Sequence, residues 1–320
     1  MPRNRVAQPI EAGRRRVSFM SAMRTGRMIV DCHTQFHCHQ PTFSPNDSVV
    51  GFDTDDIDEE GYLRAVDPVD RAIVLGFRSR TLNLGVSNDA VAEYVRRHAP
   101  KLIGFAGLDP TEDGCFDELR RARDELGLKG VVVSPPLQDY HPTDTRAMRF
   151  YEECARLEMP VLFEQNHHSP ASRLAYARPV LLDEIAREYP SLRIVIAHMG
   201  YPWVDETVVL LGKHPNAYAD VSGLLCHPWQ CYNALLAAYE YGVIDKLLFG
   251  SDFPYLSPAE GIESLYSINQ LSIGSNLIAI PREKLRGIVE RNALALLGIA
   301  REGDLRASER RPVGLIVDDE

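Results

Sequence analysis

Residues 194–198 are Ile-Val-Ile-Ala-His, a run of four apolar residues followed by a histidine. Near-continuous apolar runs are typical of strands in a parallel sheet, because such strands are buried on both faces. Similar short runs recur along the chain and predict eight strands. These are Met28–Cys32, Arg71–Leu75, Leu102–Ala106, Gly130–Ser134, Val161–Glu164, Arg193–Ala197, Ala217–Val221 and Lys246–Phe249.

Amphipathic segments separate these runs and predict helices. They are Asn88–His98, Phe116–Leu126, Thr145–Leu157, Val180–Tyr189, Tyr232–Tyr241 and Pro281–Leu297. Alternation of strands and helices is typical of α/β folds, and eight strands favour a closed (β/α)8 TIM barrel. No GxGxxG turn follows the first strand, which argues against a dinucleotide-binding fold. The sequence therefore predicts one barrel domain over residues 28–300.

The two ends of the chain differ from this pattern. Residues 1–27 are rich in arginine and lack periodicity, which predicts a disordered extension, with a targeting peptide as the alternative. Residues 301–320 are charged and mostly aperiodic and are predicted to be a tail. Residues 34–62 form a long, acidic connection after the first strand, where lids and binding loops are common.

Composition restricts the partners of this protein. The net charge of −10 argues against nucleic-acid binding, which depends on basic contacts to phosphate. No apolar stretch approaches the roughly 20 residues that span a bilayer, so no membrane segment is expected. The six cysteines form no CxxC pair, which favours reduced thiols and a cytoplasmic location.

Polar side chains recur at the carboxyl ends of the predicted strands. His33 follows the first strand, Glu164 ends the fifth, His198 follows the sixth and Asp252 follows the eighth. One such residue could be an ordinary polar group at a strand end. Because strand ends of a barrel converge on one pocket, the four together predict an active site there.

Several motifs, in this order, resemble one family of barrel enzymes. They are Asp31-x-His33, Gly104-Phe105-Ala106 with Asp109-Pro110, Gly127-Leu128-Lys129-Gly130, Ala197-His198-Met199-Gly200, Asn216-Ala217-Tyr218-Ala219-Asp220-Val221-Ser222-Gly223, Phe249-Gly250-Ser251-Asp252-Phe253-Pro254 and Asn292-Ala293-Leu294-Ala295-Leu296-Leu297-Gly298. The chain resembles the amidohydrolase-related (amidohydrolase 2) metal-dependent hydrolases, which include aminocarboxymuconate-semialdehyde decarboxylase-like enzymes. The resemblance spans roughly residues 28–299.

The resemblance implies a divalent metal, a metal-binding residue at His33, and Asp252 as ligand or catalytic base. It also implies that His198 is a catalytic proton-transfer group. Two positions depart from the family pattern: Gln35 replaces a second strand-one ligand, and Glu164 stands where a histidine is expected. We expect Gln35 and Glu164 to complete the metal set.

Zinc is the first expectation for the metal, following the family. Replacing a histidine by Glu164 lowers the formal charge of the site from about +1 to zero and weakens the metal as a Lewis acid. A set rich in oxygen favours Mn²⁺ or Mg²⁺. Two alternatives remain: His167 or His168 supplies a nitrogen ligand, or the site holds no metal and Glu164, Asp252 and His198 perform acid–base chemistry.

Further residues are candidates for substrate binding. Arg78 and Arg80 follow the second strand and could bind a substrate carboxylate, although solvated loop arginines are common. His227 and Trp229 follow the seventh strand and could flank a planar ligand. A small, carboxylated organic substrate is expected.

The resulting prediction is a metal-dependent hydrolase of a small carboxylated molecule. The alternatives are a decarboxylase of the same family, a metal-independent lactonase-like hydrolase, and a degenerate barrel that binds a ligand without turnover. Dimers are common among the proteins that the chain resembles, so the resemblance allows a homodimer.

Overall fold

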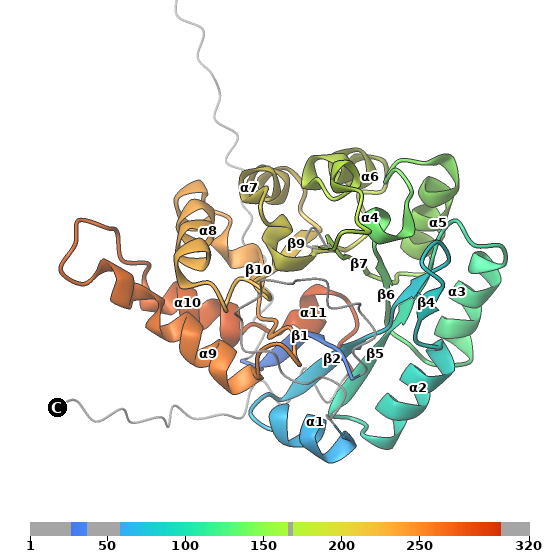
Figure 1. Ribbon diagram of the computed structural model, residues 1–320, viewed down its shortest axis with the longest axis horizontal. Helices are drawn as coiled ribbons and strands as arrows, with labels where there is room; N and C mark the ends of the chain where they lie inside the picture. The colour runs from blue at the N-terminus through green and yellow to red at the C-terminus, as the bar shows by residue number, and fades with distance from the viewer. Residues whose placement is uncertain (1–26, 37–57, 166–168, 302–320) are drawn as a thin grey trace, which may run out of the picture.

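The computed structural model describes residues 27–36, 58–165 and 169–301 (Figure 1). Eight strands form one parallel sheet that is nearly closed into a barrel. In sheet order they are β1 (Val30–Thr34), β2 (Arg71–Leu75), β5 (Leu102–Gly107), β6 (Gly130–Val133), β7 (Val161–Phe163), β8 (Ile194–Ile196), β9 (Ala217–Asp220) and β10 (Leu247–Leu248). Each predicted strand overlaps an observed one, so the prediction of a TIM barrel is confirmed.

The barrel closes where the chain after β10 lies against β1. The backbone N–H of Cys32 donates to the carbonyl of Phe249 at 2.9 Å, and that of Gln35 donates to the carbonyl of Phe253 at 2.9 Å. Between them, the N–H of Asp252 donates to the carbonyl of His33 at 3.0 Å. These bonds join the two chain regions that carry the first and last predicted site residues.

Helices surround the strands, most of them on the outside of the barrel (Figure 1). They are α1 (Glu59–Ala65), α2 (Asn88–Arg97), α3 (Cys115–Asp124), α4 (Pro135–Gln138), α5 (Thr145–Arg156), α6 (Leu182–Glu188), α7 (Val204–Lys213), α8 (Pro228–Tyr241), α9 (Pro258–Ser267), α10 (Arg282–Val289) and α11 (Ala293–Leu296). Helices α1, α4, α7 and α9 were not among the predicted segments. The helix expected over residues 281–297 is two helices, because Asn292 caps a new one by accepting from the N–H of Ala295 at 3.1 Å.

The apolar core has two layers that alternate along each strand. Ala72 and Val74 of β2 pack outward against the helices, whereas Ile73 and Leu75 point into the barrel lumen. Period-two alternation of this kind follows from strand geometry. Helix α11 packs Ala293, Leu294 and Leu297 against the lumen residues, so it covers the amino-terminal end of the barrel. The opposite end carries the polar strand termini.

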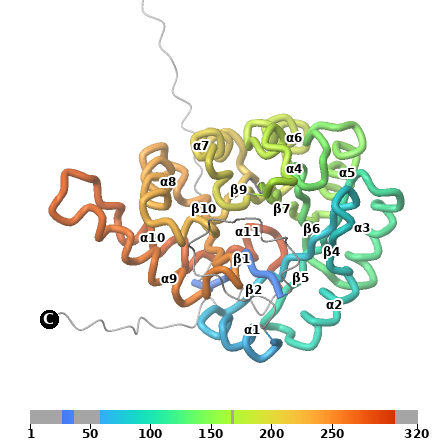
Figure 2. Tube along the Cα trace, in the orientation of Figure 1, coloured from blue at the N-terminus to red at the C-terminus, as the bar shows by residue number. Residues whose placement is uncertain are grey.

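The connections between barrel strands and helices contain a short hairpin and several 3₁₀ turns. Strands β3 (Arg78–Ser79) and β4 (Leu84–Gly85) form a short antiparallel hairpin, and 3₁₀ turns occur at Leu174–Tyr176, Pro179–Leu181, Ala197–Gly200, Ile244–Lys246 and Ile268–Ser272. The connection between α9 and α10 extends away from the barrel (Figure 2). Among the described residues, no helix has the length and apolar character needed to cross a bilayer.

Most of the two predicted tails, residues 1–26 and 302–320, lies outside the described residues, as do residues 37–57 of the long first connection.

Candidate metal and catalytic site

Strand periodicity points two carboxylates into the mouth of the barrel. Leu162 of β7 and Tyr218 of β9 face the lumen. Glu164 and Asp220 each lie two residues further along the chain, and so they point to the same side as these lumen residues. Both carboxylates are buried.

His33 reaches the same space through an irregularity in β1. Asp31 pairs with Ala72 and Thr34 pairs with Val74, so β1 has one extra residue between these two pairs. A bulge of this kind bends a strand locally and re-aims a side chain. The imidazole of His33 is fully buried.

His198 and Asp252 lie in unusual backbone conformations just past their strands. The φ angle of His198 is 54° and that of Asp252 is 64°. Left-handed conformations are uncommon outside glycine and persist where the surrounding contacts impose them. For His198 one such contact is its backbone N–H, which donates to Oδ1 of Asp220 at 3.0 Å.

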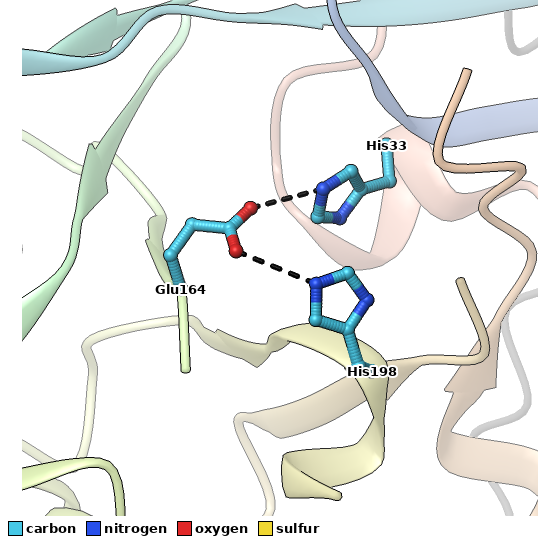
Figure 3. Close-up of side chains that lie close together, drawn as sticks. All are labelled: His33, Glu164 and His198. Atoms are coloured by element: carbon cyan, nitrogen blue, oxygen red, sulfur yellow. Dashed lines mark ion pairs between the residues drawn. The ribbon is translucent and has the colours of Figure 1, made fainter. Parts of the chain in front are cut away.

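Glu164 lies between the two histidines, as Figure 3 shows. Its Oε1 atom is 2.9 Å from Nε2 of His33, and its Oε2 atom is 3.5 Å from Nε2 of His198. The two imidazole rings lie 4.9 Å apart between centroids. Oδ1 of Asp252 lies 3.4 Å from the same Nε2 atom of His33. The structure therefore brings four of the predicted site residues together.

The carboxylates change the protonation of both histidines. Burial acts to lower the pKa of His33, but Glu164 and Asp220 outweigh this and raise that pKa well above its usual value. Burial likewise acts to lower the pKa of His198, yet Glu164 and Asp252 raise it to about 9. Both shifts favour the protonated form of the imidazole when only these side chains surround it.

The carboxyl groups are shifted in different directions. The pKa of Glu164 is lowered, because its ion pairs with His33 and His198 outweigh its burial. The pKa of Asp252 is raised, because burial outweighs its attraction to the same histidines. Asp31 accepts hydrogen bonds from the N–H groups of His33 and Ser251, and burial raises its pKa to about 6.

The cluster formed by His33, Glu164, His198 and Asp252 has donor atoms that suit a metal ion. One ligand atom each from His33, Glu164 and His198 can be chosen so that all lie within 4.8 Å of one another. Nε2 of His33 is buried and makes no hydrogen bond of good geometry with the described residues, despite the short distance to Glu164. Imidazole nitrogen and carboxylate oxygen are ligands for Zn²⁺ and Mn²⁺, so the residues present fit a divalent metal.

The ligand role of Gln35 stays a prediction. Gln35 is partly buried, and its backbone N–H forms one of the hydrogen bonds that close the barrel. His167 and His168, the alternative ligands, lie outside the described residues.

The predicted substrate-binding residues lie in different settings. Arg78 donates from Nε to Oε2 of Glu112 at 2.8 Å and lines a cavity of about 410 Å³ beside α2 and α3. The cluster residues are not among the described residues that line this cavity. Arg80 is exposed, and its backbone N–H donates to Asp109.

His227 directly precedes α8 and is partly buried, while Trp229 is 52% exposed and stacks on Tyr232. Substrate binding by the arginines and by these two residues stays a prediction.

Sequence reasoning gave no role to Asp220 and Ser222. Oδ2 of Asp220 lies 3.2 Å from Nδ1 of His33, and Oγ of Ser222 lies 2.9 Å from Nδ1 of His198. The sequence did hold a signal for Asp220: it lies two residues after Tyr218 on its strand, just as Glu164 lies two residues after Leu162. Asp220 and Ser222 lie in one of the motifs that carry the family resemblance.

Comparison with known proteins identifies the family. The family model described as Amidohydrolase matches residues 30–299. A curated relative, gamma-resorcylate decarboxylase of Rhodococcus jostii (strain RHA1), is 29% identical over 196 residues, which is 50% of this chain and 54% of that protein. The chain therefore matches about half the length of this relative.

Solved structures share the fold. A probable 2-pyrone-4,6-dicarboxylic acid hydrolase from Acinetobacter baumannii has a TM-score of 0.60 at 17% identity, covering 84% of this chain and 99% of that one. A dihydroxybenzoic acid decarboxylase from Polaromonas sp. JS666, with bound manganese and 2-nitroresorcinol, has a TM-score of 0.60 at 18% identity, covering 87% and 99%. Identities this low show the fold alone. The family model, whose matched range spans all eight barrel strands and the four clustered site residues, shows that the chain belongs to the amidohydrolase family of enzymes.

Proposed function

We propose that this chain is a metal-dependent decarboxylase of a hydroxylated aromatic carboxylate. The observation that carries the proposal is His198, an imidazole with a raised pKa that lies 3.5 Å from Glu164, the carboxylate that also contacts His33. The name of the gamma-resorcylate decarboxylase relative supports the substrate class. Decarboxylation was the alternative to hydrolysis in the sequence-based prediction, and we now place it first.

Decarboxylation needs one proton at carbon and consumes no water. The bond between the ring carbon and the carboxyl carbon breaks, CO₂ leaves, and the electron pair stays on the ring carbon. That carbon forms a C–H bond with the proton that Nε2 of His198 donates. His198 then regains its proton from solvent. A group whose pKa is about 9 is protonated at neutral pH and suits the acid role.

His33, Glu164 and Asp252 would hold the metal, with Gln35 as a further candidate. The set is rich in oxygen and has a formal charge near zero with a divalent ion, which favours Mn²⁺ over Zn²⁺. When bound, such an ion neutralises and orients the anionic oxygens of a hydroxybenzoate. His227 and Trp229 are proposed to flank the aromatic ring, and Arg80 to bind its carboxylate.

Hydrolysis is the second candidate, and the environment of Asp252 favours it. Its carboxyl lies 3.4 Å from His33 and has a raised pKa, as expected for a general base poised nearer to neutral pH. In that reaction Asp252 takes a proton from the water that attacks an ester or lactone carbonyl.

The deciding experiment uses the purified full chain loaded with Mn²⁺. We expect 2,6-dihydroxybenzoate to lose CO₂, and in D₂O the product should carry one deuterium at the carbon that lost its carboxyl group, as proton NMR would show. Asp252→Asn serves as the inactive control. Hydrolysis of 2-pyrone-4,6-dicarboxylate without any decarboxylation would instead establish the second candidate. Absence of both activities and of bound metal would leave the degenerate, ligand-binding barrel.

A homodimer and a cytoplasmic location complete the proposal. The first rests on the family resemblance and the second on the pattern of the cysteines.

A further inference from the structure

Asp220 is a buried carboxylate that contacts both histidines of the cluster. Its Oδ2 atom accepts a hydrogen bond from Nδ1 of His33 at 3.2 Å. Its Oδ1 atom accepts from the backbone N–H of His198 at 3.0 Å, and from both the backbone N–H and the hydroxyl of Ser222. Each carboxylate oxygen is therefore engaged, and the two oxygens serve different imidazoles.

The bond to Asp220 decides where His33 carries its proton. An ionised carboxylate only accepts hydrogen bonds, so Nδ1 of His33 must be the N–H group. The nitrogen left without a proton in the neutral ring is Nε2, which faces Glu164 and Asp252. A carboxylate that fixes a histidine in this way is a common partner of metal-binding imidazoles.

Ser222 extends the same control to His198. The Ser222 hydroxyl has one proton, and it donates that proton in a hydrogen bond to the charged Asp220 carboxylate, which can only accept. Its oxygen can then only accept from Nδ1 of His198, 2.9 Å away. Nε2 of His198 becomes the atom that exchanges protons, and it faces Glu164.

Two glycines leave room for this arrangement. A Cβ atom at Gly223 would lie 2.8 Å from Nδ1 of His198. A Cβ atom at Gly250 would lie 2.9 Å from Cβ of His33 and 3.2 Å from Cβ of Ser222. The ring of His198 and the Cβ atom of His33 thus lie directly against glycine backbone, and Asp220 on β9 contacts both residues.

We propose that Asp220, acting directly on His33 and through Ser222 on His198, is the positioning residue that directs the Nε2 atoms of both histidines toward the Glu164 carboxylate. It deepens the proposed function and rests on it for the roles of His33 as metal ligand and His198 as acid. Asp220 itself contacts neither metal nor substrate in this scheme.

The test compares Asp220→Asn and Ser222→Ala with wild type. Ser79→Ala is the matched control, since Ser79 is also fully buried and hydrogen-bonded, to the carbonyl of Leu137. The first readout is Mn²⁺ affinity, measured by calorimetric titration. We expect Asp220→Asn to weaken it roughly 10–100-fold. Ser222→Ala and Ser79→Ala should leave it unchanged, because neither serine contacts His33.

The second readout is the nitrogen-15 NMR spectrum of the histidine side chains in metal-free protein, followed from neutral to alkaline pH. In wild type we expect His33 and His198 to keep the proton on Nδ1 and to lose it from Nε2. Ser222→Ala should abolish that preference at His198 alone, and Asp220→Asn at both. The His33 and His198 signals are assigned from their own substitution variants.

An unchanged His198 pattern in folded Ser222→Ala would overturn the proposal, even if Asp220→Asn does not fold. Wild-type Mn²⁺ affinity in folded Asp220→Asn would overturn it as well. Neither readout involves a substrate, so these outcomes are independent of the proposed function. A chain that shows both expected results but decarboxylates nothing would refute the proposed function and leave this inference standing.

Discussion

Nε2 of His33 lies 2.9 Å from Oε1 of Glu164, and this contact joins the first strand of the barrel to the strand diametrically across its mouth in sheet order. Both side chains are buried, so the attraction between them is weakly screened. It raises the pKa of His33 and lowers that of Glu164. The proton on Nε2 of His33 occupies the position from which that nitrogen would bind a metal, so proton and metal compete.

This competition predicts that metal affinity depends on pH. Because the pKa of His33 lies well above its usual value, the imidazole must lose a proton before Nε2 can bind the ion. We expect Mn²⁺ affinity to rise about tenfold for each pH unit below that pKa, since one proton leaves per ion bound. Calorimetric titration in two buffers of different ionisation enthalpy measures the released proton. Affinity that does not change with pH would contradict the role of His33 as a ligand.

The identity of residue 164 is expected to select the metal. Glu164→His rebuilds the nitrogen-rich set of the resembled family and should shift preference from Mn²⁺ toward Zn²⁺. Glu164→Gln removes the negative charge, which should lower the pKa of His33 and weaken Mn²⁺ binding. Metal content by mass spectrometry, after exposure to equal Zn²⁺ and Mn²⁺, measures the preference. Glu112→Gln is the control, because Glu112 is a carboxylate paired with an arginine outside the cluster. Equal metal content in all the variants would exclude Glu164 from the metal set.

Most of the barrel could be predicted from sequence because its signals are local. Buried parallel strands are apolar runs, and each predicted run became a strand. Helix α7 was missed because its 3.6-residue periodicity is blurred by apolar residues such as Val209, which is exposed. The break between α10 and α11 depends on the cap at Asn292, a single side chain within an otherwise helical pattern.

The sequence predicted which four residues would gather at the barrel mouth, but it did not predict the contacts that hold them there. His33, Glu164, His198 and Asp252 follow from strand ends, which any barrel gathers at one face. The contacts of Asp220 depend on a bulge in β1 and on a left-handed backbone at His198, and neither has a clear signature in one sequence. Long-range pairing also hid the partner of Arg78, which is 34 residues away along the chain.

His198 should act as an acid, and the pH profile of the reaction tests this. Its pKa of about 9 means that the donating form is present below that value and is lost as pH rises through it. Decarboxylation by the Mn²⁺-loaded enzyme should therefore fall above about pH 9. His198→Asn should reduce kcat by roughly 10²–10⁴-fold, the usual contribution of a positioned acid or base, while Mn²⁺ affinity stays near wild type. A rate that instead climbs toward pH 9 would assign His198 a basic role, and lost Mn²⁺ affinity in His198→Asn would make it a ligand.

Arg78 and Arg80 are expected to separate into a structural and a substrate-binding residue. The guanidinium of Arg78 already pairs with Glu112, and both side chains are partly exposed, so Arg78→Met should cost about 0–1 kcal/mol of stability and leave KM unchanged. Arg80 is exposed, and hydrogen bonds to charged groups contribute about 1.5–3 kcal/mol. If Arg80 binds the substrate carboxylate, Arg80→Met should raise KM roughly 10–100-fold without changing thermal unfolding. Steady-state kinetics and melting curves of the two variants measure both effects. A rise in KM for Arg78→Met alone would reverse the assignment and require Glu112 to release its partner when substrate binds.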